Sequence, residues 1–191
     1  MRARTSKPGE GAGLRIIAGT WRGRRFKLPA GTQVRPTPDR VRETLFNWIG
    51  PRIVAARCLD LYAGSGILGL EALSRGAADV QFVDADRRLT AALAAQLRRL
   101  DCAAGVATMR AEQFLQRWAG DTFDIVFLDP PYDLPLEPVL ESLWPSTHEH
   151  SLVYIERQAD QGLPSCDALQ WRKQSRAGAV SFGLASPASR A

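Results

Sequence analysis

Asp60-Leu-Tyr-Ala-Gly-Ser-Gly-Ile-Leu-Gly69 is a glycine-rich turn that follows a short apolar run and opens a helical pattern. In an open α/β sheet, the turn after the first strand is where a nucleotide-like ligand binds. Gly64 and Gly66 have no Cβ, which lets the backbone approach such a ligand closely, and Gly69 permits tight packing of the helix. We therefore expect an α/β fold with a ligand site at this turn, contacted by Ala63, Gly64, Ser65 and Gly66.

Strand and helix patterns alternate from Arg57 onward, which is typical of a doubly wound parallel sheet. The β-rich runs predict strands at residues 58–61, 79–83, 106–109, 124–128 and 152–156. Helices are expected between them at residues 67–75, 86–100, 111–119 and 135–144, and right-handed crossovers then set the topology. The tail predicts two strands, around Trp171 and over residues 180–184, joined by a turn at Gly178. They complete a mostly parallel seven-stranded sheet in the antiparallel sense, with helices on both faces.

The N-terminal part of the chain predicts an appendage to this sheet. Residues 1–13 are rich in Gly, Arg, Ser and Pro without periodicity, so we expect a disordered arm. Residues 14–28, LRIIAGTWRGRRFKL, hold two glycines between short apolar segments, which predicts a small hairpin with arginines at its tip. Thr37 is expected to cap a helix that begins at Pro38 and packs through Val41, Leu45, Trp48 and Ile49. The expected units are residues 1–13, 14–50 and 51–191.

The formal net charge of +5 conceals a strong asymmetry along the chain. Residues 1–57 hold 13 Lys or Arg against three acids, whereas residues 58–191 hold 12 against 17. A cationic appendage on a mildly acidic body indicates a contact surface for a polyanion. The cluster Arg22, Arg24, Arg25 and Lys27, with Trp21 beside it for stacking, favours nucleic acid over a merely solubilising surface.

The composition argues against several other classes of protein. No apolar run approaches the roughly 20 residues needed to cross a bilayer, and no signal-peptide pattern is present. The three cysteines are far apart and odd in number, which indicates reduced thiols in a cytoplasmic protein. His148 and His150 lie in a polar segment without a third ligand, so we expect a solvated loop and no metal.

The glycine turn alone leaves two cofactor classes open. GSGILG satisfies the dinucleotide fingerprint, and Asp84, 20 residues after Gly64, would bind ribose hydroxyls in either class, so a nicotinamide oxidoreductase is one alternative. Neither histidine resembles a hydride-transfer acid. Asp60 favours S-adenosylmethionine, because sulfonium and ammonium groups suit an acidic pocket, whereas a pyrophosphate prefers helix dipoles or cations. Asp86 is a secondary ribose ligand, and a helix cap explains it equally well.

Val126-Phe-Leu-Asp-Pro-Pro-Tyr132 is the most specific motif in the chain. Pro130 and Pro131 restrict the backbone, so the Asp129 side chain and the Pro130 carbonyl can project into one pocket as acceptors. Two acceptors can grip the N–H groups of an exocyclic amine and aim its lone pair at a methyl group. Tyr132 would stack on the base, and Asp129 would orient the amine and stabilise charge. The alternative is a strand that ends in an ordinary turn.

At this point the sequence resembles the bacterial small-subunit ribosomal RNA methyltransferase D family, guanine-N2 methyltransferases that act on 16S ribosomal RNA. The resemblance covers nearly the whole chain through LRIIAGTWRGRRFKLP, RPTPDRVRETLFNWI, CLDLYAGSGILGLEALSRGA, FVDADR, DIVFLDPPY, SLVYIE and GLP. It implies a Rossmann-like class I fold with a methyltransferase domain over residues 51–191, S-adenosylmethionine as cofactor and S-adenosylhomocysteine as product. It also implies cofactor contacts at Gly64, Gly66 and Asp84, an amine site at residues 129–132, and RNA contacts from the hairpin and Arg35.

One position departs from related folds: Arg110 follows the third predicted strand of the sheet, where an acid or amide often meets the adenine amino group. The backbone of Ala111 could serve instead. A DNA adenine-N6 methyltransferase would use the same amine motif, but the chain has little room for a module that reads the major groove. A non-enzymatic RNA-binding protein would be expected to have a broken motif. The expected partner is 16S ribosomal RNA within a small subunit or an assembly intermediate, bound by a monomer without membrane contact.

Overall fold

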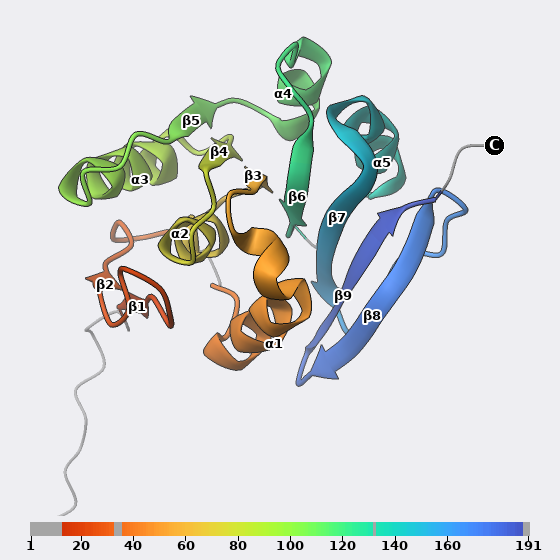
Figure 1. Cartoon of the computed structure of the whole chain (residues 1–191), viewed down its shortest axis with the longest axis horizontal. Helices are drawn as coiled ribbons and strands as arrows, with labels where there is room; N and C mark the ends of the chain where they lie inside the picture. The colour runs from red at the N-terminus through yellow and green to blue at the C-terminus, as the bar shows by residue number, and fades with distance from the viewer. Residues whose placement is uncertain (1–12, 33–35, 132, 189–191) are drawn as a thin grey trace, which may run out of the picture.

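The computed structural model describes residues 13–32, 36–131 and 133–188 (Figure 1). Two predicted site residues, Arg35 and Tyr132, therefore lie outside the described residues. So does the predicted arm over residues 1–13, apart from Gly13. The elements that position the candidate site all lie within the described ranges.

The central sheet has seven strands within the described part of the chain, in the order β5-β4-β3-β6-β7-β9-β8. Its parallel strands are β3 (Arg57–Leu61), β4 (Asp79–Asp84), β5 (Gly105–Thr108), β6 (Phe123–Leu128) and β7 (Thr147–Gln158). The tail strands β8 (Leu169–Ala177) and β9 (Val180–Pro187) are antiparallel, as predicted. Because β7 begins earlier than predicted, His148 and His150 lie on a strand and not in a loop.

The four predicted helices between the strands are present, each one to three residues shorter than expected. They are α2 (Ile67–Ser74), α3 (Arg87–Arg99), α4 (Ala111–Arg117) and α5 (Glu137–Leu143). Two short 3-10 turns, η1 (Gly50–Ile53) and η2 (Trp144–Ser146), complete the connections, and η2 takes the last residue that had been assigned to the fourth helix. No helix in the described ranges is long and apolar enough to cross a membrane.

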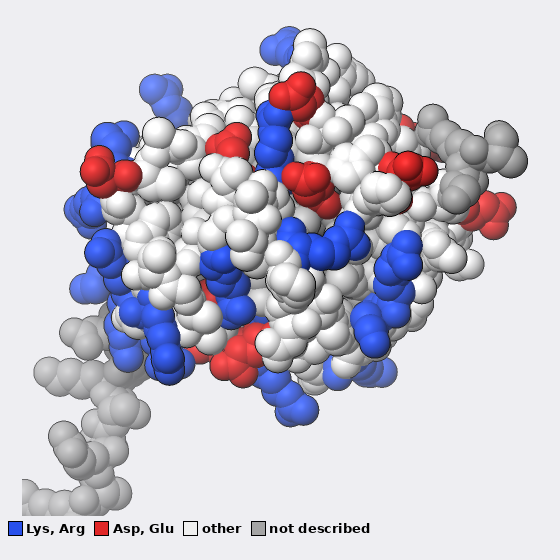
Figure 2. All heavy atoms as spheres, viewed as in Figure 1, with Lys and Arg blue, Asp and Glu red and all other residues white. Residues whose placement is uncertain are grey.

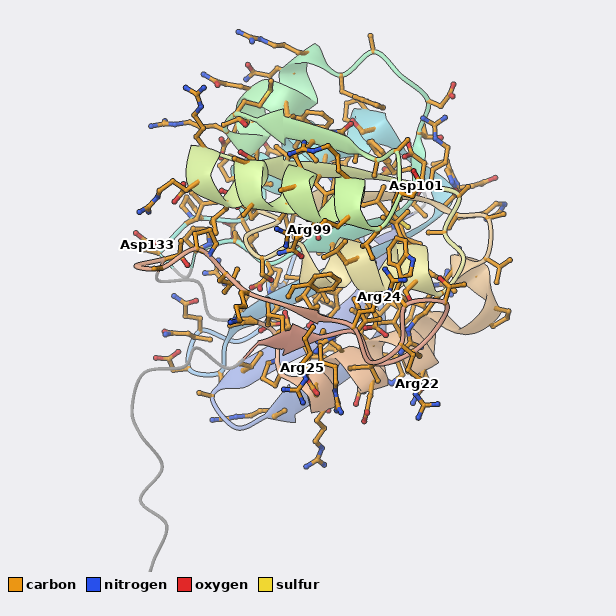
Figure 3. The ribbon with its side chains drawn as sticks, turned by 90° about the vertical axis from the view of Figure 1, so that its left-hand side faces the viewer. Arg22, Arg24, Arg25, Arg99, Asp101 and Asp133 are labelled. Carbon is orange, nitrogen blue, oxygen red and sulfur yellow. The ribbon has the colours of Figure 1, made fainter. Side chains whose placement is uncertain are left out.

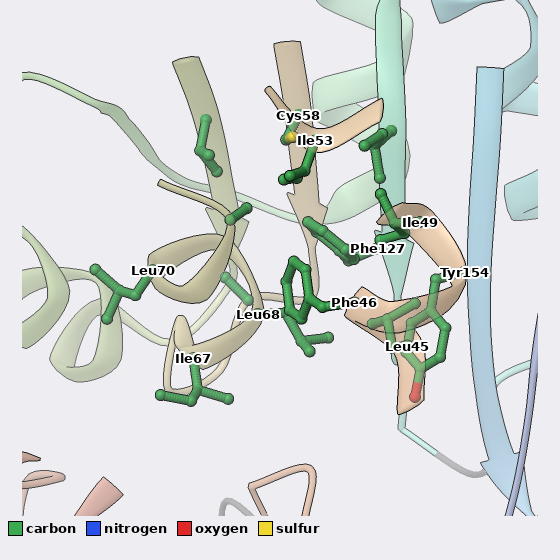
Figure 4. Close-up of a cluster of buried hydrophobic side chains, with 14 of the residues drawn as sticks. Leu45, Phe46, Ile49, Ile53, Cys58, Ile67, Leu68, Leu70, Phe127 and Tyr154 are labelled. Atoms are coloured by element: carbon green, nitrogen blue, oxygen red, sulfur yellow. The ribbon is translucent and has the colours of Figure 1, made fainter. Parts of the chain in front are cut away.

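Alternation along the strands divides the core between the two faces of the sheet. Along β6, Ile125 and Phe127 pack on one face, while Val126 and Leu128 pack on the other, as the period of two in a strand requires. The first face is covered by α1 (Asp39–Ile49), α2 and α3, and the second by α4 and α5. Figure 4 shows Phe127 surrounded by side chains of α1, α2 and the strands. The prediction of a buried sheet with helices on both faces is thus confirmed.

The N-terminal segment forms the predicted hairpin and helix, with one correction. β1 (Leu14–Arg15) pairs antiparallel with β2 (Arg25–Phe26), and α1 follows. The helix begins at Asp39 with Pro38 at the N-cap position, so Thr37 does not cap it as predicted. The Thr37 side chain instead hydrogen-bonds Glu156 of β7. Thr37 therefore links the appendage to the sheet.

Candidate active site

A cavity of about 720 Å³ opens at the carboxyl ends of β3, β4 and β6. The order of the sheet changes direction at β3, because β4 and β5 lie on one side of it and β6 on the other. Such a switch point is where open α/β sheets bind their ligands. Most of the residues predicted as cofactor and amine ligands line this cavity: Asp60, Ala63, Gly64, Ser65, Asp84, Ala111, Asp129, Pro130 and Pro131.

The glycine turn is held in place by Asp84 at the end of β4. One carboxylate oxygen accepts the Gly64 N–H at 2.7 Å, and the other accepts the Asp86 N–H at 2.8 Å. Gly64 has a φ of +53°, in the left-handed region that favours glycine. Each carboxylate oxygen retains a lone pair for a ligand, so Asp84 can both fix the turn and accept hydroxyl groups.

Asp60 places a buried carboxyl group on the wall of the cavity. Its side chain accepts the Gly69 N–H of α2 at 2.9 Å, and the residue is only 3% exposed. Burial, with a further contribution from the Asp84 charge, raises its pKa from 3.8 to about 7, against the hydrogen bond from Gly69. No basic side chain within the described ranges forms an ion pair with Asp60. The cavity thus offers an uncompensated acid to a cationic ligand.

Two predicted cofactor residues, Gly66 and Asp86, lie off the cavity wall. A Cβ on Gly66 would approach the Leu93 side chain to 2.6 Å, so this glycine serves the packing of α2 against α3. Asp86 is the N-cap of α3 and accepts the Arg88 N–H at 2.7 Å. The cap that the sequence left open as an alternative is therefore present.

Tyr62 and Glu112 line the cavity, and the sequence analysis selected neither. The Tyr62 hydroxyl donates to Glu112 at 3.2 Å, which joins the glycine turn to α4. Burial and the Glu112 charge raise the pKa of Tyr62. Tyr62 also has a φ of +66°, which costs a non-glycine residue on the order of 1 kcal/mol or more and is typical of ligand sites. Its place inside the glycine motif was the only available signal in the sequence.

Asp129 lies on the cavity wall immediately after β6, with Pro130 and Pro131 beside it. Burial raises its pKa well above 3.8, and the nearby charges of Glu156 and Asp60 raise it further. A carboxyl group with a raised pKa is a better proton acceptor once it ionises. The arrangement suits a group that orients an amine and stabilises positive charge.

Glu156 is a second acid at this end of the sheet that the sequence analysis did not select. Because Leu128 of β6 is in register with Ile155 of β7, Asp129, which follows β6, lies level with Glu156 within β7. Glu156 is 3% exposed and accepts the Tyr154 hydroxyl at 2.7 Å and a hydrogen bond from Thr37. Burial raises its pKa despite both hydrogen bonds. A Glu at the end of a buried strand, in SLVYIE, was the available signal.

The predicted RNA-contact residues lie apart from the cavity, on the hairpin. Arg22, Arg24, Arg25 and Lys27 are all exposed. Trp21 is half-buried and packs against the core under the hairpin, which leaves only part of its ring for stacking.

Comparisons with known proteins agree with this geometry. The family model described as conserved hypothetical protein 95 matches residues 14–185. Ribosomal RNA small subunit methyltransferase D of Escherichia coli (strain K12) is 43% identical over 179 residues, which cover 90% of this chain and 88% of that protein. The solved structure of “Putative methyltransferase yhhF” from Escherichia coli superposes with a TM-score of 0.84 at 40% identity, covering 93% of this chain and 99% of that chain.

A more distant neighbour shares the fold. SMU.776, described as “a putative methyltransferase complexed with SAH”, superposes with a TM-score of 0.63 at 14% identity, covering 77% of this chain and 48% of that chain. The Rossmann-like class I methyltransferase fold expected from the sequence is confirmed by these structures.

Proposed function

The chain belongs to the conserved hypothetical protein 95 family, that of small-subunit ribosomal RNA methyltransferase D, and from this premise we propose that it methylates the N2 amine of a guanine in 16S ribosomal RNA. The methyl donor in this proposal is S-adenosylmethionine, and the product of the donor is S-adenosylhomocysteine. The observation that carries the proposal is the presence, in one cavity, of an unpaired buried acid and an amine motif. A relative from Escherichia coli that is named ribosomal RNA small subunit methyltransferase D and is 43% identical also supports the proposal.

The residues of the cavity fit this cofactor. A volume of about 720 Å³ is within the usual range for a small-molecule site. Asp60 would hold the cationic methionine end, since its carboxyl group lacks a basic partner in the described part of the chain. Asp84 and the Gly64 turn would hold the ribose, and the start of α4 at Ala111 would lie near the adenine. When bound, S-adenosylmethionine supplies a methyl group on a positively charged sulfur.

The amine site then has a simple task. The Asp129 carboxylate and the Pro130 carbonyl accept the two N–H groups of an exocyclic amine, which turns its lone pair toward the cofactor site. The nitrogen becomes acidic only as it gains the methyl group, so little base strength is required beforehand. Asp129 stabilises the positive charge that develops there and is placed to take the proton that leaves. Tyr132 would stack on the flipped base, as its place in the motif suggests.

The choice of guanine over adenine rests on the resemblance to the small-subunit ribosomal RNA methyltransferase D family. Guanine presents an N1–H donor beside its amine, whereas adenine presents an acceptor at N1. A DNA adenine-N6 methyltransferase remains the second candidate, because the amine motif alone serves both bases.

The same proposal assigns RNA contact and methyl transfer to different parts of the chain. Residues 14–50 would contact RNA through Arg22, Arg24, Arg25 and Lys27, and through Arg35 outside the described residues. Residues 51–191 would carry out methyl transfer. The proposed substrate is 16S RNA in a small subunit or an assembly intermediate, bound by a monomer in the cytoplasm.

The test is transfer of radiolabelled methyl from S-adenosylmethionine to small ribosomal subunits that lack this modification, followed by nucleoside analysis. We expect N2-methylguanosine from the native protein and a loss of at least about a hundredfold with Asp129→Ala. The exposed Asp160→Ala serves as the matched control. N6-methyladenosine as the product would overturn the assignment of guanine as the target base, whereas transfer to DNA in place of RNA would support the DNA adenine-N6 alternative. Absence of transfer to subunits and to free 16S RNA would overturn the proposal.

A further inference from the structure

The basic hairpin is fixed to α2 by a buried carboxylate. Glu71 is fully buried, and its oxygens accept the N–H groups of Ile17 and Ala18 at 2.9 and 3.0 Å. The same carboxylate pairs with the buried Arg42 of α1 at 3.2 Å and with Arg75 at 2.9 Å. The hairpin is therefore held by a hydrogen-bonded charge cluster that reaches three elements.

A second anchor lies one turn further along α2. The Ser74 hydroxyl donates to the Ala18 carbonyl at 2.6 Å and accepts the Trp21 N–H at 2.9 Å, while the Ser74 carbonyl accepts the Thr20 N–H at 2.8 Å. A Cβ on Gly19, which has a φ of +81°, would come within 1.7 Å of that carbonyl. The turn of the hairpin thus sits directly on α2, so the backbone that carries its cations has a fixed position before any partner binds.

The C-terminal end of α3 adds two arginines to the positive charge of this hairpin. Arg98 and Arg99 are exposed and form no ion pair with any acid in the described ranges, and the same holds for Arg22, Arg24 and Arg25. Figure 3 shows Arg99 and the three hairpin arginines on one face of the molecule. Figure 2 shows Lys and Arg side chains crowded along this side, where Figure 1 places α3 beside the hairpin.

We propose that the clamped hairpin and the C-terminal end of α3 form one preformed surface that binds phosphates of the RNA substrate. The inference rests on the proposed function and adds Arg98 and Arg99 to the RNA contacts. Two arginines at a helix C-terminus also interact favourably with the helix dipole. That interaction does not require further cations nearby, such as those of the hairpin. Asp101 is an acid on the same face, and the arginines outnumber it. Because the backbone of the surface is already fixed, binding would cost the conformational entropy of the arginine side chains but little of the backbone.

The experiment compares RNA affinity across salt concentrations for Arg98→Gln/Arg99→Gln, with small subunits that lack the modification as the probe. Each phosphate contact contributes about 0.7 to 0.9 to the slope of log K against log salt, so we expect the slope to fall by roughly 1.4 to 1.8. Affinity at about 0.1 M salt should fall roughly tenfold or more. The variant Arg98→Lys/Arg99→Lys should retain most of the affinity and of the salt dependence, because both positive charges remain. Lys173→Gln/Arg176→Gln on β8, on the far side of the molecule in Figure 1, is the matched control.

The outcomes separate this inference from the proposed function. A slope and affinity equal to those of the native protein and of the β8 control would overturn the α3 contact, while methyl transfer by the native protein would still support the function. Failure of the native protein to bind or methylate the subunits would overturn both. S-adenosylmethionine affinity, measured in parallel, should not change in any of these variants, because all the substituted side chains are exposed and lie off the cavity wall. Thermal stability should fall only slightly in Arg98→Gln/Arg99→Gln, through the lost interaction with the α3 dipole, and should not change in Arg98→Lys/Arg99→Lys.

Discussion

The carboxyl group of Asp60 has few partners in the described part of the protein, and this leaves it available to a ligand. The side chain lies at the end of a buried strand, and a single backbone N–H, that of Gly69, satisfies part of its hydrogen-bonding capacity. Burial disfavours the charged form, which is why its pKa rises to about 7. A cationic ligand in the cavity would reverse this effect by stabilising the carboxylate.

The first prediction concerns the pH dependence of cofactor binding. Below its pKa of about 7 the Asp60 carboxyl is protonated and neutral, and above it the ionised group attracts a cation, so affinity for S-adenosylmethionine should rise between about pH 6 and 8. Asp60→Asn should bind about 10- to 100-fold more weakly at pH 8 and lose this dependence. Calorimetric titration at several pH values measures both effects, with Asp160→Asn as the control. A flat affinity profile for the native protein would contradict the role assigned to Asp60.

The second prediction concerns Glu156 and the pH dependence of the rate. The negative charge of Glu156 raises the pKa of Asp129, so Glu156→Gln should lower that pKa. If ionised Asp129 supports the reaction, the ascending limb of kcat against pH should move to lower pH in this variant. Cofactor affinity should change little, because Glu156 is not on the cavity wall. The exposed Glu149→Gln is the control, and an unmoved limb in Glu156→Gln would refute the coupling.

At the scale of elements, α2 connects the glycine turn, where the cofactor is expected to bind, with the hairpin, where RNA is expected to bind. Its N-terminal end follows the glycine turn, while its C-terminal half carries Glu71 and Ser74, which hold the hairpin. Gly69 lets the helix lie close to the sheet, because a Cβ there would approach the Phe82 ring to 2.2 Å. One short helix therefore sets the position of the basic hairpin relative to the glycine turn.

The third prediction tests this clamp. Glu71→Ala removes the carboxylate that pairs with the fully buried Arg42. It also leaves the N–H groups of Ile17 and Ala18 without their acceptor. Breaking a buried ion pair from one side costs about 3 kcal/mol or more, so the free energy of unfolding should fall by about that amount. Urea denaturation provides the measurement, and Glu141→Ala on the exposed face of α5 is the matched control. A loss below about 1 kcal/mol would mean that the clamp contributes little to stability.

At the scale of the whole molecule, charge and cavity lie on distinct parts of the same domain. The hairpin carries the exposed cations Arg22, Arg24, Arg25 and Lys27, whereas four acids, Asp60, Asp84, Glu112 and Asp129, line the cavity. Figure 2 shows the cationic side as a crowded edge of the molecule. A polyanion would be drawn to this edge, while a cationic cofactor would be drawn to the acidic cavity. The two proposed sites would therefore attract ligands of opposite charge.

The sequence by itself determined the fold class, the order of the elements and part of the cavity wall. These follow from local rules: the period of apolar residues separates strands from helices, and glycines and prolines mark turns whose backbone other residues cannot adopt. Asp60, Asp84 and Asp129 were found because each ends a strand, and the ends of parallel strands meet at one edge of a sheet.

Only the tertiary structure decided which of these residues face the cavity and which other groups join them. Gly66 packs against Leu93, Asp86 caps a helix, and Glu156 meets Thr37 across 119 positions of the chain. The clamp between Glu71 and the hairpin likewise spans more than 50 residues. Such contacts depend on the packing of helices and strands that are distant in sequence, and no local periodicity encodes the direction in which a given side chain then points.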